Sequence, residues 1–536
     1  MTMPPYGQQP APGQQPGYGQ QPAYDQPQGQ PYQGQPMYQQ PYGQPAGQWG
    51  QAPQQPTPRS GSGLKWLAFG TAGVLSFGLL GGGALFAYSK INGGGPQPEE
   101  ALPASAFAFA KLDLDPSADQ KVDAFRFARK FPGAQDPLAD MDEDGDLRKQ
   151  IFEELQEDGE FEGVDYAQDV EPWLGQRVGV ALLPGTDGGE PEVVMALAST
   201  DQDAATQGIG KLAGDGTYCS VQPEWVLCGE DQGVVDKAVN EAASAPLSEA
   251  DGFSQDMSDL GEDGIATAWM DGTKAAELES VIGEDVTGSG QSQGRYAAAL
   301  RFDGPTLEIA GRVNDLPEGS VPAGDGTSIG KLPTSTLAAF SVAGLDESLR
   351  KAWPDIDKAA RESLGDEWQE GLDDFTSETG LSVPEDVAKA VGSETTVALG
   401  PDADEPKVAF VSNGDRGLID KVVGSTQGSP SGYSSGPAFE VKDAGDGRTV
   451  VATPAGYADE VAGGSGLGDS DAFKDAVPDA DKAGTVAYAD ISKIVETFGS
   501  DMDDETRANL EPLSAVGFAM WGEGDHAEFT LRLTTK

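Results

Sequence analysis

The sequence predicts an α+β fold: a tandem duplication of a mostly antiparallel sheet unit with packed helices, preceded by one transmembrane helix and a disordered tail. Three observations lead to this prediction. The composition changes abruptly along the 536 residues, one long apolar run carries no charge, and the acidic part that follows repeats its own order of motifs. Self-similarity of this kind is the signature of a repeated structural unit.

Residues 1–63 are predicted to form a disordered cytoplasmic tail. They consist mainly of Gln, Pro, Gly, Tyr and Ala, and phrases such as Tyr6-Gly7-Gln8-Gln9-Pro10 recur in them. So few aliphatic side chains cannot offset the conformational entropy that folding would cost. The spaced tyrosines could support weak multivalent association, but the composition favours a flexible spacer.

Residues 64–90 are predicted to form a transmembrane anchor helix. The stretch from Trp66 to Tyr88 has no charged side chain, and as a helix it is long enough to cross a hydrocarbon core of about 30 Å. Arg59 and Lys65 precede it, so the positive-inside rule places the N-terminus in the cytoplasm and the rest of this single-pass protein outside the cell membrane. A cleaved signal peptide is the rival interpretation, and the long segment before the run argues against it.

The part after the anchor is strongly acidic. The chain has 88 Asp and Glu against 34 Lys and Arg, a net charge of −54, and Asp25 is the only acidic residue before Glu99. This charge excludes nucleic acid as a partner and disfavours anionic lipid headgroups. It either keeps the protein soluble or attracts cations or a basic partner, and charge balance alone speaks first for solubility.

Residues 91–100 and 314–331 are interpreted as linkers that flank two ectodomain repeats, repeat 1 (101–313) and repeat 2 (332–536). Motifs of repeat 1 return in the same order in repeat 2, which chance does not explain. Examples are Leu102-Pro103 with Leu332-Pro333, Asp169-Val170 with Asp386-Val387, Glu190-Pro191 with Glu405-Pro406, Asp271 and Lys274 with Asp490 and Lys493, and Glu308 and Arg312 with Glu528 and Arg532.

Each repeat is expected to contain, in order, a strand, a helix, paired strands, a helix, a hairpin, a helix, a strand, a helix and a final hairpin. Alternating β-branched and aromatic residues predict the strands, as in the hairpin that turns at Asp303-Gly304-Pro305. Apolar residues at helical spacing predict helices after Asp119 and after Asp231. Hairpins with interspersed helices indicate antiparallel sheets, and each repeat is large enough for its own core.

Two stretches carry a resemblance to a known family. They are LPASAFAFAKLDLDPSADQKVDAFRFARKFP (102–132) and DYAQDVEPWLGQRVGVALLP (165–184). With the Gln/Pro/Gly/Tyr tail and the single anchor, the chain resembles an actinobacterial family catalogued as a domain of unknown function (number three-three-five-two), over roughly residues 100–536. The resemblance implies a membrane-anchored protein that faces the cell envelope, and it brings no activity and no catalytic residues.

Cys219 and Cys228, the only cysteines, are predicted to form a disulfide. The segment between them is expected to be a hairpin that turns at Pro223-Glu224, which places the cysteines opposite each other at a non-hydrogen-bonded position. Their Cα atoms are closest there, and an oxidising exterior favours the bond. Two buried unpaired thiols are the alternative, and the single histidine of the chain argues against a zinc site.

Asp140, Asp142, Asp144 and Asp146 form the one candidate metal site. Oxygen ligands at alternate positions, with a glycine at the turn, match the start of a calcium loop. Position twelve of that loop, however, is Ile151 instead of a bidentate Glu. The broken motif favours the alternative, an acidic loop at the N-terminus of a helix over 147–155. Calcium is the only candidate cofactor, and no catalytic residues are identified.

The expected function is a non-enzymatic binding or scaffolding role in the cell envelope, with an envelope protein or a lipid as the partner. Two alternatives stay open: a carrier of a hydrophobic ligand, and a hydrolase whose carboxylates the sequence does not identify. Asp271 with Lys274 and Asp490 with Lys493 are the first place to look for a shared feature. Because both repeats have the pair, we expect an architectural role for it.

Overall fold

The computed structural model describes residues 95–132, 147–157, 159, 161, 163–185, 189–214, 216–261, 264–274, 294–317, 326–428, 439–464 and 466–536, all within one compact unit. The predicted tail (1–63), the predicted anchor (64–90) and the acidic loop with Asp140, Asp142, Asp144 and Asp146 lie outside these residues. None of the helices in the described part has the length and apolarity that a membrane span requires.

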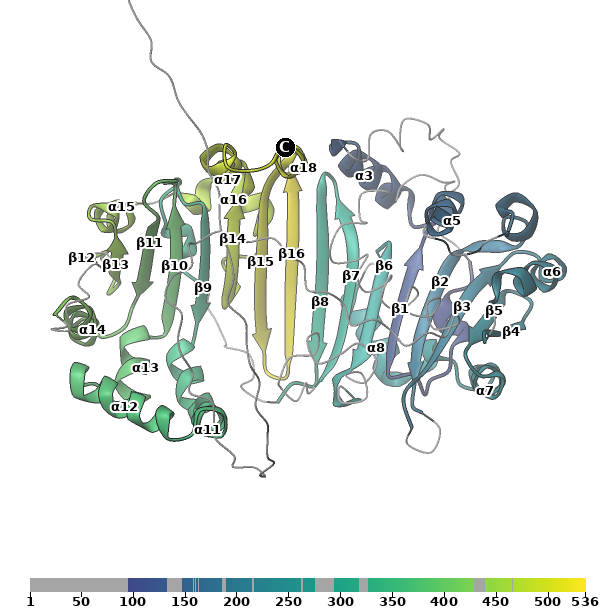
Figure 1. Cartoon of the computed structure of the whole chain (residues 1–536), viewed down its shortest axis with the longest axis horizontal. Coiled ribbons are helices and arrows are strands. Elements are labelled where there is room, and N and C mark those ends of the chain that lie inside the picture. The colour runs from purple at the N-terminus through teal and green to yellow at the C-terminus, as the bar shows by residue number, and fades with distance from the viewer. Residues whose placement is uncertain are drawn as a thin grey trace, which may run out of the picture. The chain divides into compact units, whose positions relative to one another are not determined.

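Sixteen strands form one antiparallel sheet (Figure 1). In repeat 1 they are β1 (Ala108–Asp113), β2 (Leu174–Leu183), β3 (Glu192–Ser199), β4 (Tyr218–Val221), β5 (Trp225–Gly229), β6 (Ala266–Asp271), β7 (Arg295–Asp303) and β8 (Thr306–Asn314). In repeat 2 they are β9 (Ala338–Ala343), β10 (Glu394–Gly400), β11 (Lys407–Ser412), β12 (Glu440–Asp443), β13 (Thr449–Thr453), β14 (Thr485–Asp490), β15 (Leu513–Glu523) and β16 (His526–Thr535).

The two repeats have the same strand order. From the outer edge inwards it is β4-β5-β3-β2-β1-β6-β7-β8 in repeat 1 and β12-β13-β11-β10-β9-β14-β15-β16 in repeat 2. The α+β character and the antiparallel pairing agree with the sequence prediction. The sequence did not predict that the two sheets join: the last strands, β8 and β16, pair with each other, and we call this pairing the seam.

Helices lie on both faces of the sheet. Those of repeat 1 are α2 (Pro98–Ala101), α3 (Ala118–Ala128), α5 (Leu147–Glu157), the π-helical turn η1 (Tyr166–Val170), α6 (Gln202–Leu212), α7 (Gln232–Ala242) and α8 (Asp251–Leu260). Those of repeat 2 are α11 (Leu345–Leu364), α12 (Asp366–Thr379), α13 (Glu385–Val391), α14 (Arg416–Gly428), α15 (Tyr457–Gly463), α16 (Asp471–Ala476), α17 (Ile491–Phe498) and α18 (Asp504–Leu510).

One face of the sheet, which we call face A, carries a helix-covered core in each repeat. In repeat 1, Phe253 of α8 packs with Phe109 and Trp269 of the sheet. In repeat 2, Phe473 of α16 packs with Tyr488 at the matched position. The buried residues of each of these two clusters come from one repeat, except Ile329, which lies between the repeats and joins the cluster of repeat 2.

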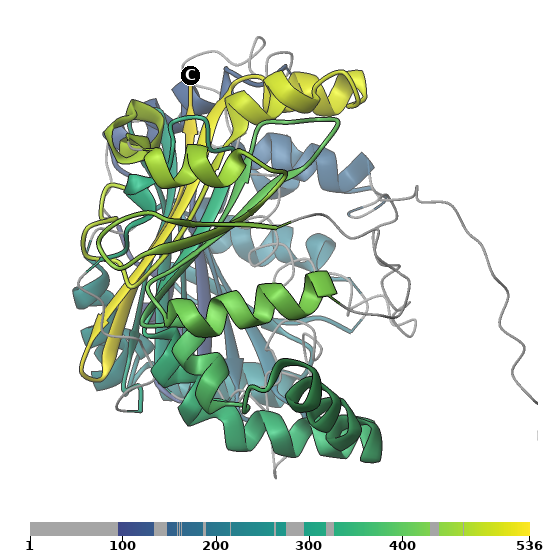
Figure 2. The ribbon, with the colours of Figure 1, turned by 90° about the vertical axis from the view of Figure 1, so that its left-hand side faces the viewer.

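The opposite face, face B, is covered in repeat 1 by α3, α5, η1 and α6. On the seam side, Phe127 of α3 packs with Phe302 of β7. On the outer side, residues of α5, η1 and α6 pack onto β2, β3 and β5. In Figure 2 the helices α11 to α13 of repeat 2 stand on one side of the sheet and α15 and α16 on the other.

A repeated aspartate lies within the helical turn before the second strand of each repeat and accepts a hydrogen bond from a backbone N–H four residues earlier. Asp169 accepts a hydrogen bond from the backbone N–H of Asp165, and Asp386 accepts one from that of Ser382. Lys211 holds the pKa of Asp169 below its ordinary value, assisted by the Asp165 N–H. The backbone N–H and the hydroxyl of Ser382, with Lys389, lower the pKa of Asp386 to about 2. The duplicated Asp-Val motif therefore has a structural role.

This capping predicts a pH dependence of stability for Asp386→Asn. The folded pKa of about 2 lies below the unfolded value of about 3.9. The ionised carboxylate therefore stabilises the fold above pH ~4, and this contribution is lost as the pH falls through the folded pKa. The difference in unfolding free energy between the parent chain and the variant, from denaturant titrations, is expected to shrink between pH 5 and pH 2.5. A difference that stays constant with pH would contradict this assignment.

Candidate functional site

Face B of repeat 2 presents apolar side chains that the helices do not bury. Phe340 of β9 lies opposite Val397 of β10, and Ala338 lies opposite Leu399. The exposed fractions of Phe340, Val397 and Leu399 are 48%, 40% and 44%. The row continues outward through half-buried Phe410, Val451 and Val441. We call these six side chains (Phe340, Val397, Leu399, Phe410, Val451 and Val441) the open face.

The matched positions of repeat 1 are covered. The registers of β1 with β2 and of β9 with β10 match Ala110 to Phe340, Val180 to Val397 and Leu182 to Leu399. Ala110, Val180 and Leu182 are 7%, 3% and 5% exposed. The same strand positions of one topology therefore have opposite exposure in the two repeats.

Helix placement explains the difference. In repeat 1, Trp173 after η1 and Ile209 of α6 are buried against the outer strands of face B, and the Trp173 Nε1–H donates to the Asp169 carbonyl at 2.7 Å. In repeat 2, neither α11 nor α12 has a buried residue. These two helices instead contact each other, with Trp353 and Trp368 ring centroids 6.1 Å apart. Because α11 and α12 turn apolar side chains toward each other, the centre of face B in repeat 2 stays exposed.

The covered end of face B in repeat 2 marks the limit of the open face. The Ser412 hydroxyl donates to the carbonyls of Ala390 and Val391, and the Thr395 hydroxyl also donates to Val391. These bonds fix α13 over one end of β10 and β11. Val397 and Leu399 lie further along β10, beyond this cover.

The apolar residues of helix α17 are half-buried, and none of them is fully buried. The helix begins at the aspartate that the sequence comparison singled out. Asp490 accepts bonds from the Lys493 N–H at 2.9 Å, the Lys493 Nζ at 2.6 Å and the Tyr488 hydroxyl at 3.2 Å. Asp271 likewise accepts from the N–H and the hydroxyl of Thr273. Both aspartates organise the turn after a strand, which is an architectural role.

A family model described as "Protein of unknown function (DUF3352)" matches residues 69–222 and 211–419. The chain belongs to this DUF3352 family. No curated protein and no solved structure matches it. Two matched regions in one chain agree with an internal duplication, although the division falls within 211–222 and not in the linker between the repeats. The family resemblance expected from residues 102–132 and 165–184 is confirmed.

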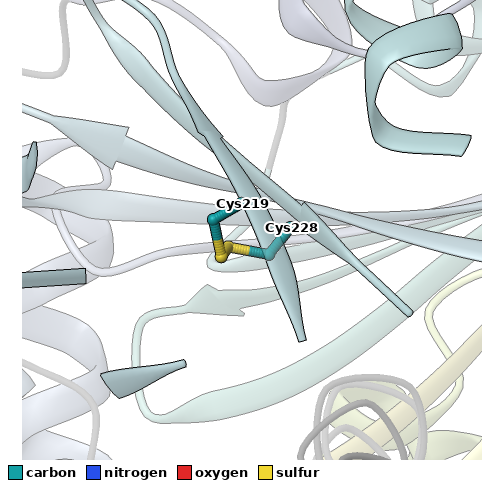
Figure 3. Close-up of a disulfide and its surroundings, with 2 residues drawn as sticks. All are labelled: Cys219 and Cys228. Atoms are coloured by element: carbon teal, nitrogen blue, oxygen red, sulfur yellow. A yellow bond between two sulfur atoms is a disulfide. The ribbon is translucent and has the colours of Figure 1, made fainter. Parts of the chain in front are cut away.

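The predicted disulfide of this DUF3352 chain is present (Figure 3). Cys219 of β4 and Cys228 of β5 are directly opposite, with Cα atoms 4.2 Å apart, and the hairpin turns between Gln222 and Trp225. The bond lies on face B, where Cys228 joins the buried cluster of repeat 1. The matched positions of repeat 2 hold Val441 and Val451, which also face each other.

The double variant Cys219→Val/Cys228→Val gives repeat 1 the residues of repeat 2. A closed loop of about ten residues corresponds to about 2–3 kcal/mol of stabilisation in the chain-entropy model, partly offset here by buried valine side chains. We expect a lower denaturant midpoint for the variant and no further decrease when reductant is added. The parent chain should lose stability on reduction. Equal midpoints for all four samples would show that the bond does not constrain the unfolded chain.

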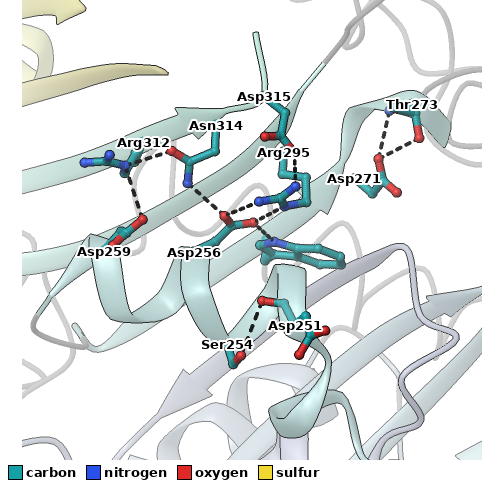
Figure 4. A network of polar contacts seen from close by, with 11 residues as sticks. Asp251, Ser254, Asp256, Asp259, Asp271, Thr273, Arg295, Arg312, Asn314 and Asp315 are labelled. Carbon is teal, nitrogen blue, oxygen red and sulfur yellow. Dashed lines mark hydrogen bonds and ion pairs between the residues drawn. The ribbon is translucent and has the colours of Figure 1, made fainter. Parts of the chain in front are cut away.

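Face A of repeat 1 contains a buried charge network (Figure 4). Asp256 of α8 is fully buried and accepts hydrogen bonds from Arg295, the Trp269 Nε1–H and the Asn314 amide, at 2.8–3.1 Å. The hydrogen bonds that Arg295 donates to Asp256 raise the pKa of Arg295. Because both oxygens of the carboxylate accept bonds from several donors, the network reads as structural.

Repeat 2 has no counterpart of this network at the matched positions. At the positions that match Asp256, Trp269, Arg295 and Asn314, repeat 2 has Ala476, Tyr488, Ala515 and Thr534, in that order. The Thr534 hydroxyl donates to the Ala515 carbonyl instead.

Removing only the carboxylate should be costly. Asp256→Ala removes the buried acceptor of the Trp269 N–H and of Arg295, which keeps its exposed partner Asp315, and we expect a loss of about 3–5 kcal/mol in unfolding free energy. The double variant Asp256→Ala/Arg295→Ala removes both charges and copies repeat 2, so it should be more stable than the single variant. Denaturant unfolding of both chains checks this. A double variant less stable than the single one would contradict the assignment.

No group of three or more metal-ligating side chains gathers within the described residues. The calcium candidate lies outside them and stays a prediction. One acidic pocket of about 700 Å³ lies beside the N-terminus of α7, lined in part by Glu190, Glu192, Glu230 and Asp231 together with Lys237. Acidic side chains are common on the surface of so acidic a chain, so those lining this pocket do not by themselves indicate a binding site.

The sequence did not predict that the open face would be exposed. Val397 and Val180 occupy similar apolar runs in the two repeats, and only the position of the helices distinguishes them. One available signal was the apolar stripe of α11, with Trp353, Ile356 and Leu364, on a helix that also carries a proline.

Proposed function

We propose that this chain is a non-enzymatic binding protein of the cell envelope, and that the open face of repeat 2 takes a hydrophobic ligand. The observation that carries the proposal is the contrast between Phe340, Val397 and Leu399 and their covered counterparts in repeat 1. Exposed apolar patches on soluble domains mark ligand or partner sites. Full burial of each such side chain contributes about 1.5–3 kcal/mol.

Two features of the surroundings favour a lipid acyl chain as the ligand. The row from Phe340 to Val441 crosses five strands and is apolar throughout, which suits an extended hydrocarbon. The predicted membrane anchor would keep the domain close to lipid.

The net charge of the chain limits which lipid headgroups the ligand can have. With a net charge of −54 the chain repels anions. A lipid with an uncharged or cationic headgroup is therefore favoured over a fatty acid anion or an acidic phospholipid.

Binding of an uncharged fluorescent apolar probe, N-phenyl-1-naphthylamine, tests the site. We expect saturable fluorescence enhancement that an uncharged monoacylglycerol displaces at lower concentration than a fatty acid anion does. Phe340→Ser/Val397→Ser should weaken probe binding by about tenfold or more, since it removes over 1.4 kcal/mol of apolar burial. The matched control is Val122→Ser, which removes an apolar residue that is exposed on α3, away from the open face.

One other outcome would overturn the site, and two would point to other occupants. Unchanged probe affinity in the Phe340 variant overturns the ligand site. A chain starting at residue 95 that binds the probe when the full chain does not would identify the preceding residues as the cover. A molecular mass that doubles with concentration, and is halved by Phe340→Ser, would identify a second copy.

The hydrolase alternative is less favoured by the carboxylates of the described part. A general acid at neutral pH has a raised pKa. Every described carboxylate with a shifted pKa is shifted downward, by a neighbouring cation or by backbone N–H groups. These carboxylates are Asp169, Asp357, Asp386, Asp402, Glu440 and Asp503.

A further inference from the structure

The seam between the repeats has a local two-fold axis. β8 and β16 are the last strands of their repeats and hold equivalent places in the two strand orders. The match of Glu308 with Glu528 and of Arg312 with Arg532 makes Ala310 equivalent to Thr530. Ala310 and Thr530 lie directly opposite each other in the antiparallel seam. Equivalent residues therefore lie opposite each other at this point. On either side of it, each pair of opposite residues has a counterpart in which the two repeats are interchanged.

The ion pairs across the seam are reciprocal. Glu308 lies opposite Arg532, and Arg312 lies opposite Glu528. Both pairs form: the Arg312 Nη1 is 2.8 Å from Glu528, and the Arg532 guanidinium contacts Glu308. The Glu308 and Arg532 side chains are 6% and 12% exposed. A symmetric dimer has this arrangement, in which residue i contacts j and j contacts i.

We infer that the seam is a homodimer interface made internal by duplication, so that the partner surface of one repeat unit is a second copy of the same unit. The free last strand of a single unit would expose a row of unpaired backbone groups together with one Glu and one Arg. A second copy satisfies both through the same antiparallel register.

Two positions on face B show how the two copies have since specialised. Phe529 lies opposite Gly311, where an added Cβ would come within 2.1 Å of the Phe529 ring. At the symmetry-related position, Leu531 lies opposite Ile309. Repeat 2 paired with itself would set Phe529 against Leu531, and repeat 1 with itself would set Ile309 against Gly311. Cross pairing fits the side chains best, so it is the favoured but not the sole pairing.

The test uses the full-length chain with a protease site introduced within residues 318–325 and cut after folding. We expect the two cut halves to remain a one-to-one complex in native mass spectrometry. Arg312→Glu should cause loss of this complex on dilution, and the charge exchange Arg312→Glu/Glu528→Arg should restore it. The matched control Arg361→Glu changes the net charge equally at an exposed site on α11. If the control complex dissociates as readily as the Arg312→Glu complex, the effect is general charge repulsion and not the loss of the seam ion pair.

Exchange of the cut halves between complexes tests whether each repeat also pairs with a copy of itself. After dilution and concentration of the cut chain, we expect homodimers of repeat 1 and of repeat 2 beside the cross pair. Phe529→Ile gives repeat 2 the residue that repeat 1 has at position 309, and it should raise the share of repeat 2 homodimer. Cross pairs and single halves alone, in both parent and variant, would overturn the inference. So would separated halves that lose their circular dichroism, because a self-complementary unit has to fold as its own dimer.

Discussion

A β-sheet has two faces, and in water an apolar face has to be covered by something. This constraint organises the described part of the chain, in which sixteen strands form one sheet. Face A is covered in both repeats by helices that bury Phe253 and Phe473. Face B is covered in repeat 1 by α3, α5 and α6. In repeat 2 no residue of α11 or α12 is buried, and Phe340 and Val397 on face B stay exposed.

Duplication supplies a reason for this imbalance. Repeat 1 keeps the reinforcing features: the disulfide Cys219–Cys228 and the buried network around Asp256. Repeat 2 has valines and alanines at the matched positions and leaves its apolar row uncovered. Under the proposed function, one copy stabilises the common sheet and the other takes the ligand. The seam joins them through Arg312 and Glu528 and their symmetric counterparts.

Local features of the fold could be predicted from the sequence, and long-range ones could not. The hairpin with Cys219 and Cys228 depends on a short turn and on alternation. Helix α3, which has Asp119 in its first turn, depends on the spacing of its apolar residues, and α7 depends also on its cap Asp231. The seam depends on a register between strands more than two hundred residues apart. Glu308 and Arg312 were visible as a repeated pair, but their partners were not. The open face depends on where α11 comes to lie, which the strand sequences do not encode.

The central claim is that face B of repeat 2 is a ligand-binding face, and native mass spectrometry of the protein isolated gently from its own host tests it most directly. The account predicts extra mass that disappears on denaturation and is recovered as an uncharged or cationic lipid. The extra mass should be absent from a chain with Phe340→Ser/Val397→Ser. A bare mass, lighter than the sequence by only the two hydrogens of the disulfide, would contradict the account and direct the search to protein partners.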